Sequence, residues 1–310
     1  MLVENKKYHI PVLLKPSVDE LVQDVGGIYV DVTYGGGGHS AEILSRLSSK
    51  GALVAFDQDL DAEANLSADS RLSFVRQNFS FYQNYLRALD KLPVDGVLAD
   101  LGVSCHQFDV AERGFSFRFD SEIDMRMDSG SGKSAKDILN NYTESQLSDM
   151  FYKYGELRNS RKAAHLIIEY RLEREILRTT DLIEALEGIV PEKKRNQFLS
   201  QVFQSIRIEV NDEIESLKQM LVDGVDLLND GGRFVVMSYH SLEDRLVKNL
   251  FKRGSFSGDI EKDFFGNIIN NMKEINRKVI IASSEEQKEN NNKSLVPELD
   301  LPLLCSLTSS

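Results

Sequence analysis

The sequence contains only two cysteines, Cys105 and Cys305, in 310 residues. They lie far apart, and neither has a cysteine or histidine neighbour at metal-ligand spacing. A disulfide framework needs several paired cysteines, and a structural zinc site needs clustered Cys and His ligands. The scarcity therefore argues against both, and it fits a protein of a reducing compartment.

Long apolar runs are also missing. The first 15 residues mix Glu4, Lys6, Lys7 and His9 with short apolar stretches, so they contain no continuous signal-peptide core. No later stretch approaches the roughly 20 apolar residues that a membrane-spanning helix needs. We therefore expect a cytoplasmic protein with no membrane partner.

Basic side chains are in the minority, and the formal net charge is −12. Because neutralising phosphates requires clustered Lys and Arg, this balance disfavours wholesale nonspecific binding of nucleic acid. Residues 151–210 nevertheless hold 11 basic and 9 acidic side chains, against 26 and 40 in the rest of the chain. This mildly basic segment is a candidate RNA-facing surface, although a solvated helix face is the commoner explanation of such an imbalance.

The first third of the chain alternates between strand and helix patterns. Short apolar runs predict strands, and residues 40–48 have apolar positions at helical spacing. The predicted strands are Ile28–Val32, Ala52–Phe56, Phe74–Val75 and Gly96–Leu101. This alternation predicts an α/β fold with a Rossmann-like parallel sheet and helices on both faces.

The alternation stops near Asp109, and helical patterns without convincing strands follow as far as Val190. The predicted helices there are Ser134–Leu139, Thr143–Tyr154, Arg161–Arg174 and Thr180–Glu187. A helix at 211–228, a turn at 230–232 and a strand at 233–238 then resume the first pattern. The sequence thus predicts an all-helical insertion in the sheet, a further strand at 278–282, and a flexible tail after Ser283.

A run of glycines, 35–38, follows the first predicted strand, which indicates close approach of the backbone to a ligand. A P-loop would need Lys followed by Ser or Thr after the last glycine, where His39 and Ser40 stand. A dinucleotide fingerprint survives in the register that starts at Gly36, because Ala41 is a tolerated third position. The glycine run is therefore compatible with a dinucleotide ligand as well.

Three aspartates, Asp31, Asp57 and Asp100, end predicted strands. Ligands of open parallel sheets bind beyond the carboxyl ends of the strands, so these acids are expected to line one crevice. Such a crevice repels a pyrophosphate but suits a sulfonium cation that carries an amino group. Any one of the three could be only a turn former or a helix cap, but together they favour S-adenosylmethionine.

Several longer motifs occur in a fixed order over nearly the whole chain. They are HIPVLL at 9–14, DVTYGGGGHS at 31–40, DLGVSCHQFDVAERGFSF at 100–117, DMRMD at 124–128, YGE at 154–156, FQSIRIEVN at 203–211, GGR at 231–233 and SYHSLEDR at 238–245. With these motifs the sequence resembles the bacterial RsmH (MraW) family of small-subunit ribosomal RNA methyltransferases. That family methylates N4 of a cytidine in the decoding region of 16S rRNA.

The resemblance implies a Rossmann-like class I methyltransferase sheet with an inserted all-helical domain. Residues 1–108 and 206–310 would form the S-adenosylmethionine-binding domain, and residues 109–205 a helical insertion that recognises RNA. Carried over by position, the residues implied to contact the cofactor are Gly37, Gly38, His39, Asp57, Phe79, Asp100 and Gln107.

The catalytic task is to hold a poor amino nucleophile in line with the methyl group and to accept a hydrogen bond from it. Asp100 is the first candidate acceptor and Ser104 the second. The stretch 100–104 lacks an aromatic residue to stack on the base, so Phe115 or Phe117 is expected to supply one. His240 follows a strand end, where it would either relay the proton or cap the next helix.

Arg113 and Arg126 are candidate phosphate contacts, and the DMRMD segment around Arg126 also fits a salt-bridged structural loop. The predicted substrate is 16S rRNA in the small ribosomal subunit. A noncatalytic RNA-binding or assembly factor, and a dinucleotide-dependent oxidoreductase, remain as alternatives. The sequence does not distinguish a monomer from a homodimer.

Overall fold

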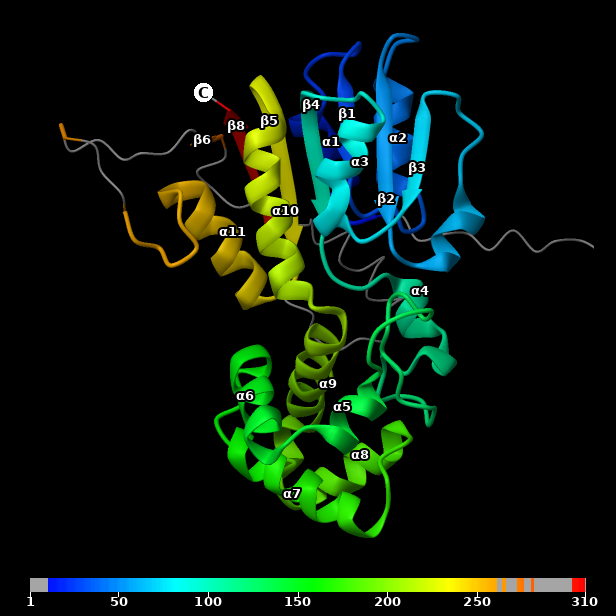
Figure 1. Ribbon diagram of the computed structural model, residues 1–310, viewed down its shortest axis with the longest axis vertical. Helices are drawn as coiled ribbons and strands as arrows, with labels where there is room; N and C mark the ends of the chain where they lie inside the picture. Colours follow the sequence, from blue (N-terminus) through cyan, green and yellow to red (C-terminus); the bar gives the residue numbers. More distant parts are fainter. Residues whose placement is uncertain (1–10, 261–263, 266–271, 276–279, 282–302, 310) are drawn as a thin grey trace, which may run out of the picture. The chain divides into compact units, whose positions relative to one another are not determined.

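The computed structural model describes residues 11–260, 264–265, 272–275, 280–281 and 303–309 (Figure 1). These residues form two compact units, one made of residues up to Gly102 and from Glu215 onward, the other of Val103–Ile214. The predicted insertion, 109–205, lies inside the second unit. Among the described helices, none combines the length and the apolar character needed to cross a membrane.

The first unit is built on a sheet whose strands run in the order β3-β2-β1-β4-β5-β8-β6. The five parallel strands are β1 (Ile28–Asp31), β2 (Ala52–Asp57), β3 (Leu72–Arg76), β4 (Val94–Asp100) and β5 (Leu228–Ser238). The antiparallel strands are β8 (Leu303–Ser309), which pairs with β5, and β6 (Met272–Glu274) and β7 (Ile280–Ile281), which pair with β8. The predicted parallel sheet is confirmed.

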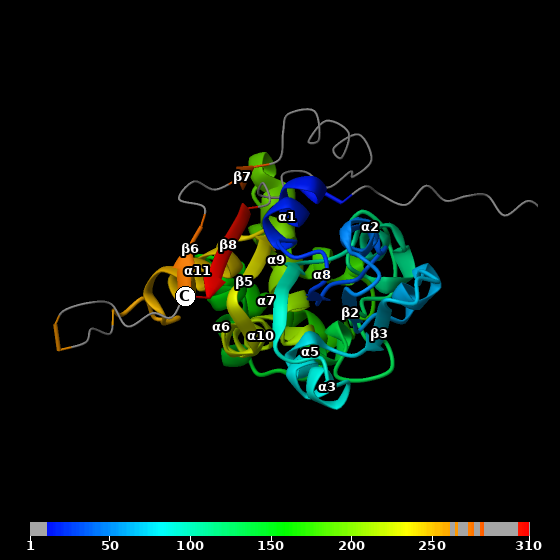
Figure 2. The ribbon, with the colours of Figure 1, turned by 90° about the horizontal axis from the view of Figure 1, so that it is seen from above.

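Helices cover both faces of this sheet (Figure 2). The helices are α1 (Leu14–Leu21), α2 (Gly38–Arg46), α3 (Tyr82–Ala88), α10 (Glu213–Leu227) and α11 (Ser241–Arg253), with short 3₁₀ turns at Leu60–Asn65 (η1) and Phe79–Phe81 (η2). Successive residues of a strand point to opposite faces. In β4, Leu98 accordingly packs with α1 and α2, whereas Val97 and Ala99 pack with α3, α10 and α11.

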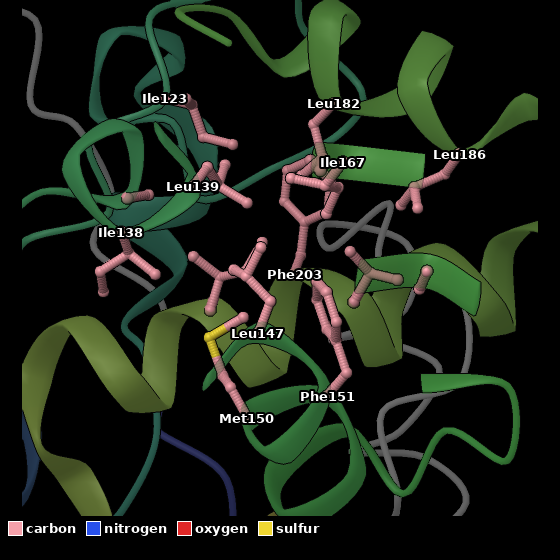
Figure 3. Packing of buried hydrophobic residues seen from close by; sticks show 14 of the residues in the cluster. Ile123, Ile138, Leu139, Leu147, Met150, Phe151, Ile167, Leu182, Leu186 and Phe203 are labelled. Carbon is pink, nitrogen blue, oxygen red and sulfur yellow. The ribbon is translucent and has the colours of Figure 1, made fainter. Parts of the chain in front are cut away.

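The second unit is helical. Its elements are α4 (Cys105–Asp109), α5 (Ala135–Asn141), α6 (Glu144–Gly155), α7 (Ser160–Glu173), α8 (Thr179–Leu186) and α9 (Arg195–Asn211), with 3₁₀ turns at Ala111–Arg113 (η3), Glu187–Ile189 (η4) and Glu192–Lys194 (η5). Figure 3 shows how Leu147, Phe151, Ile167 and Phe203 converge on a core that this unit builds for itself. The four predicted helices correspond to α5–α8.

One prediction needs correction, and one helix was missed. Residues 303–309, expected in a flexible tail, form β8 because the edge of β5 offers backbone partners that the local sequence does not reveal. Helix α9 was not predicted, although apolar residues at 198, 199, 202, 203 and 206 follow helical spacing. The helix expected at 211–228 corresponds to α10 (Glu213–Leu227), and Asp212, in a left-handed conformation (φ 49°), separates it from α9.

The predicted turn at 230–232 lies inside β5. There the pairing with β4 shifts between Val94 and Gly96, and Gly231 has φ 77°. Of the strand expected at 278–282, Ile280–Ile281 are described and form β7; the other three residues lie outside the described part of the chain.

Candidate active site

The glycine turn joins β1 to α2 at the carboxyl end of the sheet. Gly37 has φ 76°, and a Cβ there would lie 2.7 Å from the Tyr34 hydroxyl; a Cβ on Gly38 would lie 2.4 Å from Cγ of Pro11. Contacts within the chain therefore leave no room for a side chain at Gly37 or Gly38. Gly35 differs, because its φ is 50° but a Cβ would meet no atom of the described residues within 4 Å. The turn thus presents open space at Gly35.

Asp31, at the end of β1, is fully buried. Its Oδ2 accepts a hydrogen bond from the Ser40 hydroxyl (2.6 Å), and its Oδ1 accepts one from the Thr33 amide (3.1 Å). Burial raises the pKa of Asp31 above its ordinary value, because the charged form loses its hydration. Asp31 therefore ties β1 to the first turn of α2 beneath the glycine turn.

Asp57, at the end of β2, faces the glycine turn. Its Oδ2 accepts from the Gly35 amide (2.7 Å) and its Oδ1 from the Asp59 amide (2.8 Å). Burial raises the pKa of Asp57 to about 6. A carboxylate oxygen has more than one acceptor position, so Asp57 can hold the turn and still accept from the two hydroxyls of a ribose.

Asp100 ends β4 next to β1, and its backbone amide donates a hydrogen bond to the Thr33 hydroxyl oxygen (2.7 Å). Its Oδ1 accepts a hydrogen bond from the Tyr239 hydroxyl (2.7 Å), and its Oδ2 lies 3.7 Å from Nδ1 of His39. Burial raises the pKa of Asp100 to about 7, and repulsion from Glu243 adds to the rise. Within the described residues Oδ2 receives no hydrogen bond, so this oxygen is available to a ligand.

His39, the second residue of α2, is 4% exposed. Its Nε2 is buried and has no hydrogen-bond partner among the described residues. Burial lowers the pKa of His39, so the ring is neutral at pH 7 and does not neutralise the acids around it. A buried polar atom without a partner is costly, and a ligand in this pocket would supply the missing contact.

Phe79 lies in η2, just after β3, and is partly buried against the core. Asn78 fixes this turn by accepting from the Ser80 amide (2.8 Å) and by donating to Oε1 of Gln58 (2.8 Å). Phe79 is thereby held at the same end of the sheet as Asp57, where an aromatic ring can contact a nucleobase.

The donors and acceptors at this end of the sheet fit S-adenosylmethionine. Three carboxyl groups with raised pKa values, Asp31, Asp57 and Asp100, lie near one neutral histidine. Such a site favours a ligand that brings positive charge and disfavours a pyrophosphate. The open side of Gly35 and the unpartnered Nε2 of His39 indicate where the ligand would contact the protein.

Ser104, the second candidate acceptor, and Gln107, an implied cofactor contact, belong to the second unit, and there they cap a helix. The Ser104 hydroxyl accepts from the Gln107 amide (3.2 Å), and Oε1 of Gln107 accepts from the Ser104 amide (3.1 Å). This reciprocal pair is a capping box that starts α4. The contacts of Ser104 and Gln107 within their own unit are therefore structural.

The predicted RNA-contacting residues also serve the second unit's own structure. The guanidinium of Arg113 donates to the carbonyls of Arg126 and Met127, both at 3.0 Å, and Arg126 pairs with Asp124 (2.8 Å). Phe115 is 3% exposed and packs in the core. In this conformation Phe115 serves the core of the second unit, and its stacking on a base stays a prediction.

Phe117 is partly buried, and its ring packs edge-on against Phe203 at a centroid distance of 5.5 Å. Met125 and Met127 are buried in the same core. The DMRMD segment is therefore a salt-bridged loop with its methionines inward, as the structural reading of that motif expected.

His240 caps α11. Its Nδ1 accepts from the Glu243 amide (3.4 Å), and its Nε2 lies 3.1 Å from Oε1 of Glu243. Of the two readings left open for His240, the geometry supports the cap. The neighbouring Tyr239, which was not singled out from the sequence, is the residue of this motif that touches Asp100. Its signal was its position directly after a strand that ends beside Asp100.

A parallel sheet of order β3-β2-β1-β4-β5 with an antiparallel strand beside β5, and a glycine turn with three acids at its carboxyl end, defines a Rossmann-like class I methyltransferase. Comparison with known families agrees. Residues 6–296 match the MraW methylase family, and the chain belongs to it. It is an S-adenosylmethionine-dependent methylase, and the dinucleotide alternative is not favoured.

Curated relatives share about half of its residues. The chain is 52% identical over 277 residues to the ribosomal RNA small subunit methyltransferase H of Parabacteroides distasonis, covering 89% of this chain and 91% of the relative. It is also 52% identical over 274 residues to the protein of the same name from Flavobacterium johnsoniae, with coverage of 88% and 91%. A solved rRNA methylase from Streptococcus thermophilus overlaps it loosely, with a TM-score of 0.41, 11% identity and coverage of 96% and 93%, and no argument rests on that overlap.

Proposed function

We propose that this protein transfers a methyl group from S-adenosylmethionine to the N4 amino group of a cytidine in the decoding region of 16S rRNA, within the small ribosomal subunit. Membership of the MraW methylase family and the names of the curated relatives support the ribosomal substrate. A ribosomal particle as substrate puts the reaction in the cytoplasm.

The observation that supports methyl transfer to an amino group is the hydrogen bonding of the Asp100 carboxylate. One of its oxygens is held by Tyr239, and the other receives no hydrogen bond within the described residues. The cofactor, when bound, supplies the electrophilic methyl group. The amino group of cytosine is a poor nucleophile, because its lone pair is delocalised into the ring. In our proposal Oδ2 of Asp100 accepts a hydrogen bond from N4–H, which stabilises the positive charge that develops on the nitrogen, and the methylated N4 then releases its proton to solvent to give the neutral product.

The cofactor contacts follow from the same geometry. We propose that Asp57 accepts from the ribose hydroxyls, that Phe79 contacts the adenine, and that the turn at Gly37 and Gly38 with His39 borders the methionine part. The raised pKa values of Asp57 and Asp100 support a cationic ligand, since a nearby positive charge relieves the cost of ionising them.

The second unit is proposed to help recognise RNA, as expected for residues 109–205. Lys193, Lys194 and Arg195 are exposed at the start of α9. Replacing Lys193 and Lys194 by Gln should raise KM for the small subunit and reduce the salt dependence of binding, and it should leave the affinity for S-adenosylmethionine unchanged. Unchanged KM and salt dependence would remove these two residues from the proposed surface.

The direct test uses small ribosomal subunits that lack the modification. Wild-type protein with methyl-labelled S-adenosylmethionine should label 16S rRNA, and nucleoside mass spectrometry should find N4-methylcytidine. Asp100→Ala should abolish labelling while the subunit still binds. Absence of N4-methylcytidine with wild-type protein, despite intact cofactor binding, would refute the proposal, and binding to subunits without turnover would favour the noncatalytic assembly factor.

A further inference from the structure

Tyr239 occupies the junction between β5 and α11. The register pairs Asp100 of β4 with Met237 of β5, so Tyr239 stands just beyond the carboxyl end of the sheet, beside Asp100. Its amide donates to Oε2 of Glu243 (3.1 Å), and the next residue, His240, caps α11. The backbone of Tyr239 is therefore fixed from both sides.

The phenol of Tyr239 points at the carboxylate and divides its two oxygens. The hydroxyl donates to Oδ1 of Asp100 at 2.7 Å, which is a short hydrogen bond to an acidic group. Oδ2 lies 3.7 Å from Nδ1 of His39, beyond hydrogen-bond distance. A carboxylate that rotates freely offers either oxygen to a ligand, whereas this one offers Oδ2.

The ring of Tyr239 lies near Gly102, in the turn that follows β4. Gly102 adopts φ 100°, and a Cβ on it would lie 3.5 Å from Cδ2 of Tyr239, which is ordinary contact. The backbone after β4 thus lies near the ring and leaves room for it. The backbone on either side of Tyr239 is held by β5 and by the cap of α11, and the hydroxyl donates to Asp100.

The charged and titratable groups around Asp100 come from four elements of the first unit. Asp31 lies at the end of β1, His39 in α2, Tyr239 after β5 and Glu243 in α11. Asp31 and Glu243 oppose ionisation of Asp100, and the buried His39 is neutral near pH 7. The hydroxyl of Tyr239 is the hydrogen bond that favours the charged form.

We infer that Tyr239 is a positioning residue for the proposed methyl transfer: its hydroxyl holds the Asp100 carboxylate ionised and turned so that Oδ2 faces the reacting amino group. The inference rests on the proposed function and goes beyond it, because it assigns a role to a residue that does not touch the reacting atoms. It also separates the tasks of the adjacent Tyr239 and His240.

The test compares Tyr239→Phe with Tyr82→Phe. The matched control removes a buried hydroxyl that donates to the carbonyl of Met220 (3.0 Å), away from Asp100. Two quantities are measured: the pH profile of kcat/KM on small subunits, and the pKa of Asp100 in the free protein from the ¹³C shift of its carboxyl carbon, assigned with Asp100→Asn. Thermal unfolding shows that each variant is folded.

Tyr239→Phe should raise the pKa of Asp100, because it removes a hydrogen bond to the charged form. The acid limb of the kcat/KM profile should therefore move to higher pH by roughly one pH unit. At pH 7 kcat/KM should fall roughly fivefold, because the ionised fraction of Asp100 drops from about one half to about one tenth, and raising the pH should restore most of it. Tyr82→Phe should leave both quantities unchanged.

A Tyr239→Phe protein whose acid limb and Asp100 titration match the wild type would overturn the inference, even if its rate were lower, since that loss would be structural. If wild-type protein failed to methylate subunits, the proposed function would fall. The carboxyl titration would still report whether Tyr239 controls Asp100.

Discussion

Replacing Asp100 by Asn should stabilise the folded protein at neutral pH while removing activity. The carboxyl group is 23% exposed, and its pKa rises from the ordinary 3.8 to about 7 in the folded state. Between these two values the folded state binds a proton that the unfolded state has released, so the stability of the wild type falls as pH rises. Asn carries no proton in this range, and the variant lacks that loss.

The size of this stabilisation follows from the pKa shift of Asp100. About 3 pKa units at about 1.4 kcal/mol each set a ceiling of about 4 kcal/mol at pH 8, of which about 2 kcal/mol has already accumulated at pH 5. Partial exposure lowers the real figure, and we expect Asp100→Asn to add about 1–3 kcal/mol to the free energy of unfolding at pH 8 and about half as much at pH 5. Tyr239 can donate to the Asn oxygen as it does to the carboxylate.

Guanidinium unfolding followed by circular dichroism at pH 5 and pH 8 measures both values. Asp69→Asn is the control of opposite sign, because the side-chain hydrogen bond from Arg71 lowers the pKa of Asp69 to about 2. That variant should lose stability, and more at pH 8 than at pH 3. A gain for Asp100→Asn that is the same at both pH values, or larger at pH 5, would show that the carboxyl is not strained by burial.

Four further outcomes are expected. Gly37→Ala should lower the free energy of unfolding by about 1–3 kcal/mol, because φ is 76° and the new Cβ meets the Tyr34 hydroxyl at 2.7 Å; calorimetry that finds no loss would contradict this packing. Gly35→Ala should lower the free energy of unfolding by only about 1 kcal/mol, because its φ is 50° but the new Cβ meets no described atom. It should weaken the binding of S-adenosylmethionine, measured by calorimetric titration, and unchanged affinity would show that the cofactor does not approach Gly35. The kcat/KM of the wild type should fall as pH drops below about 7, tenfold per unit, as Asp100 takes up its proton, and a profile flat down to pH 5 would exclude an ionised Asp100 from the rate. Phe115→Ala should destabilise the second unit by about 3–5 kcal/mol in denaturant unfolding, whereas an exposed base-stacking residue would cost little.

The part of the site that lies at the ends of the strands was predictable from the sequence. Asp31, Asp57 and Asp100 each end a short apolar run, and in a parallel sheet such ends meet at one edge. The glycine turn was predictable for the same reason, although two of its glycines serve the chain's own packing.

Residues outside that pattern were harder to assign. Arg113, Phe115, Ser104 and Gln107 all carry chemistry that could serve a ligand, and the structure shows that they also have partners within their own unit: carbonyls, a core and a capping box. A residue type states what a side chain can do. The partners that the folded chain brings to it, near or far in sequence, show what it contacts.

The sequence by itself determined the α/β alternation, the helical segment between two parts of a sheet and the acidic strand ends, because hydrophobic periodicity and strand termini are local properties. Only the tertiary structure decided the place of β8 beside β5, the burial that raises the pKa of Asp100, and the contact of Tyr239 with Asp100 across 139 positions of the chain. Backbone pairing, desolvation and side-chain contact depend on what surrounds a residue in space, and the neighbours in sequence do not specify that.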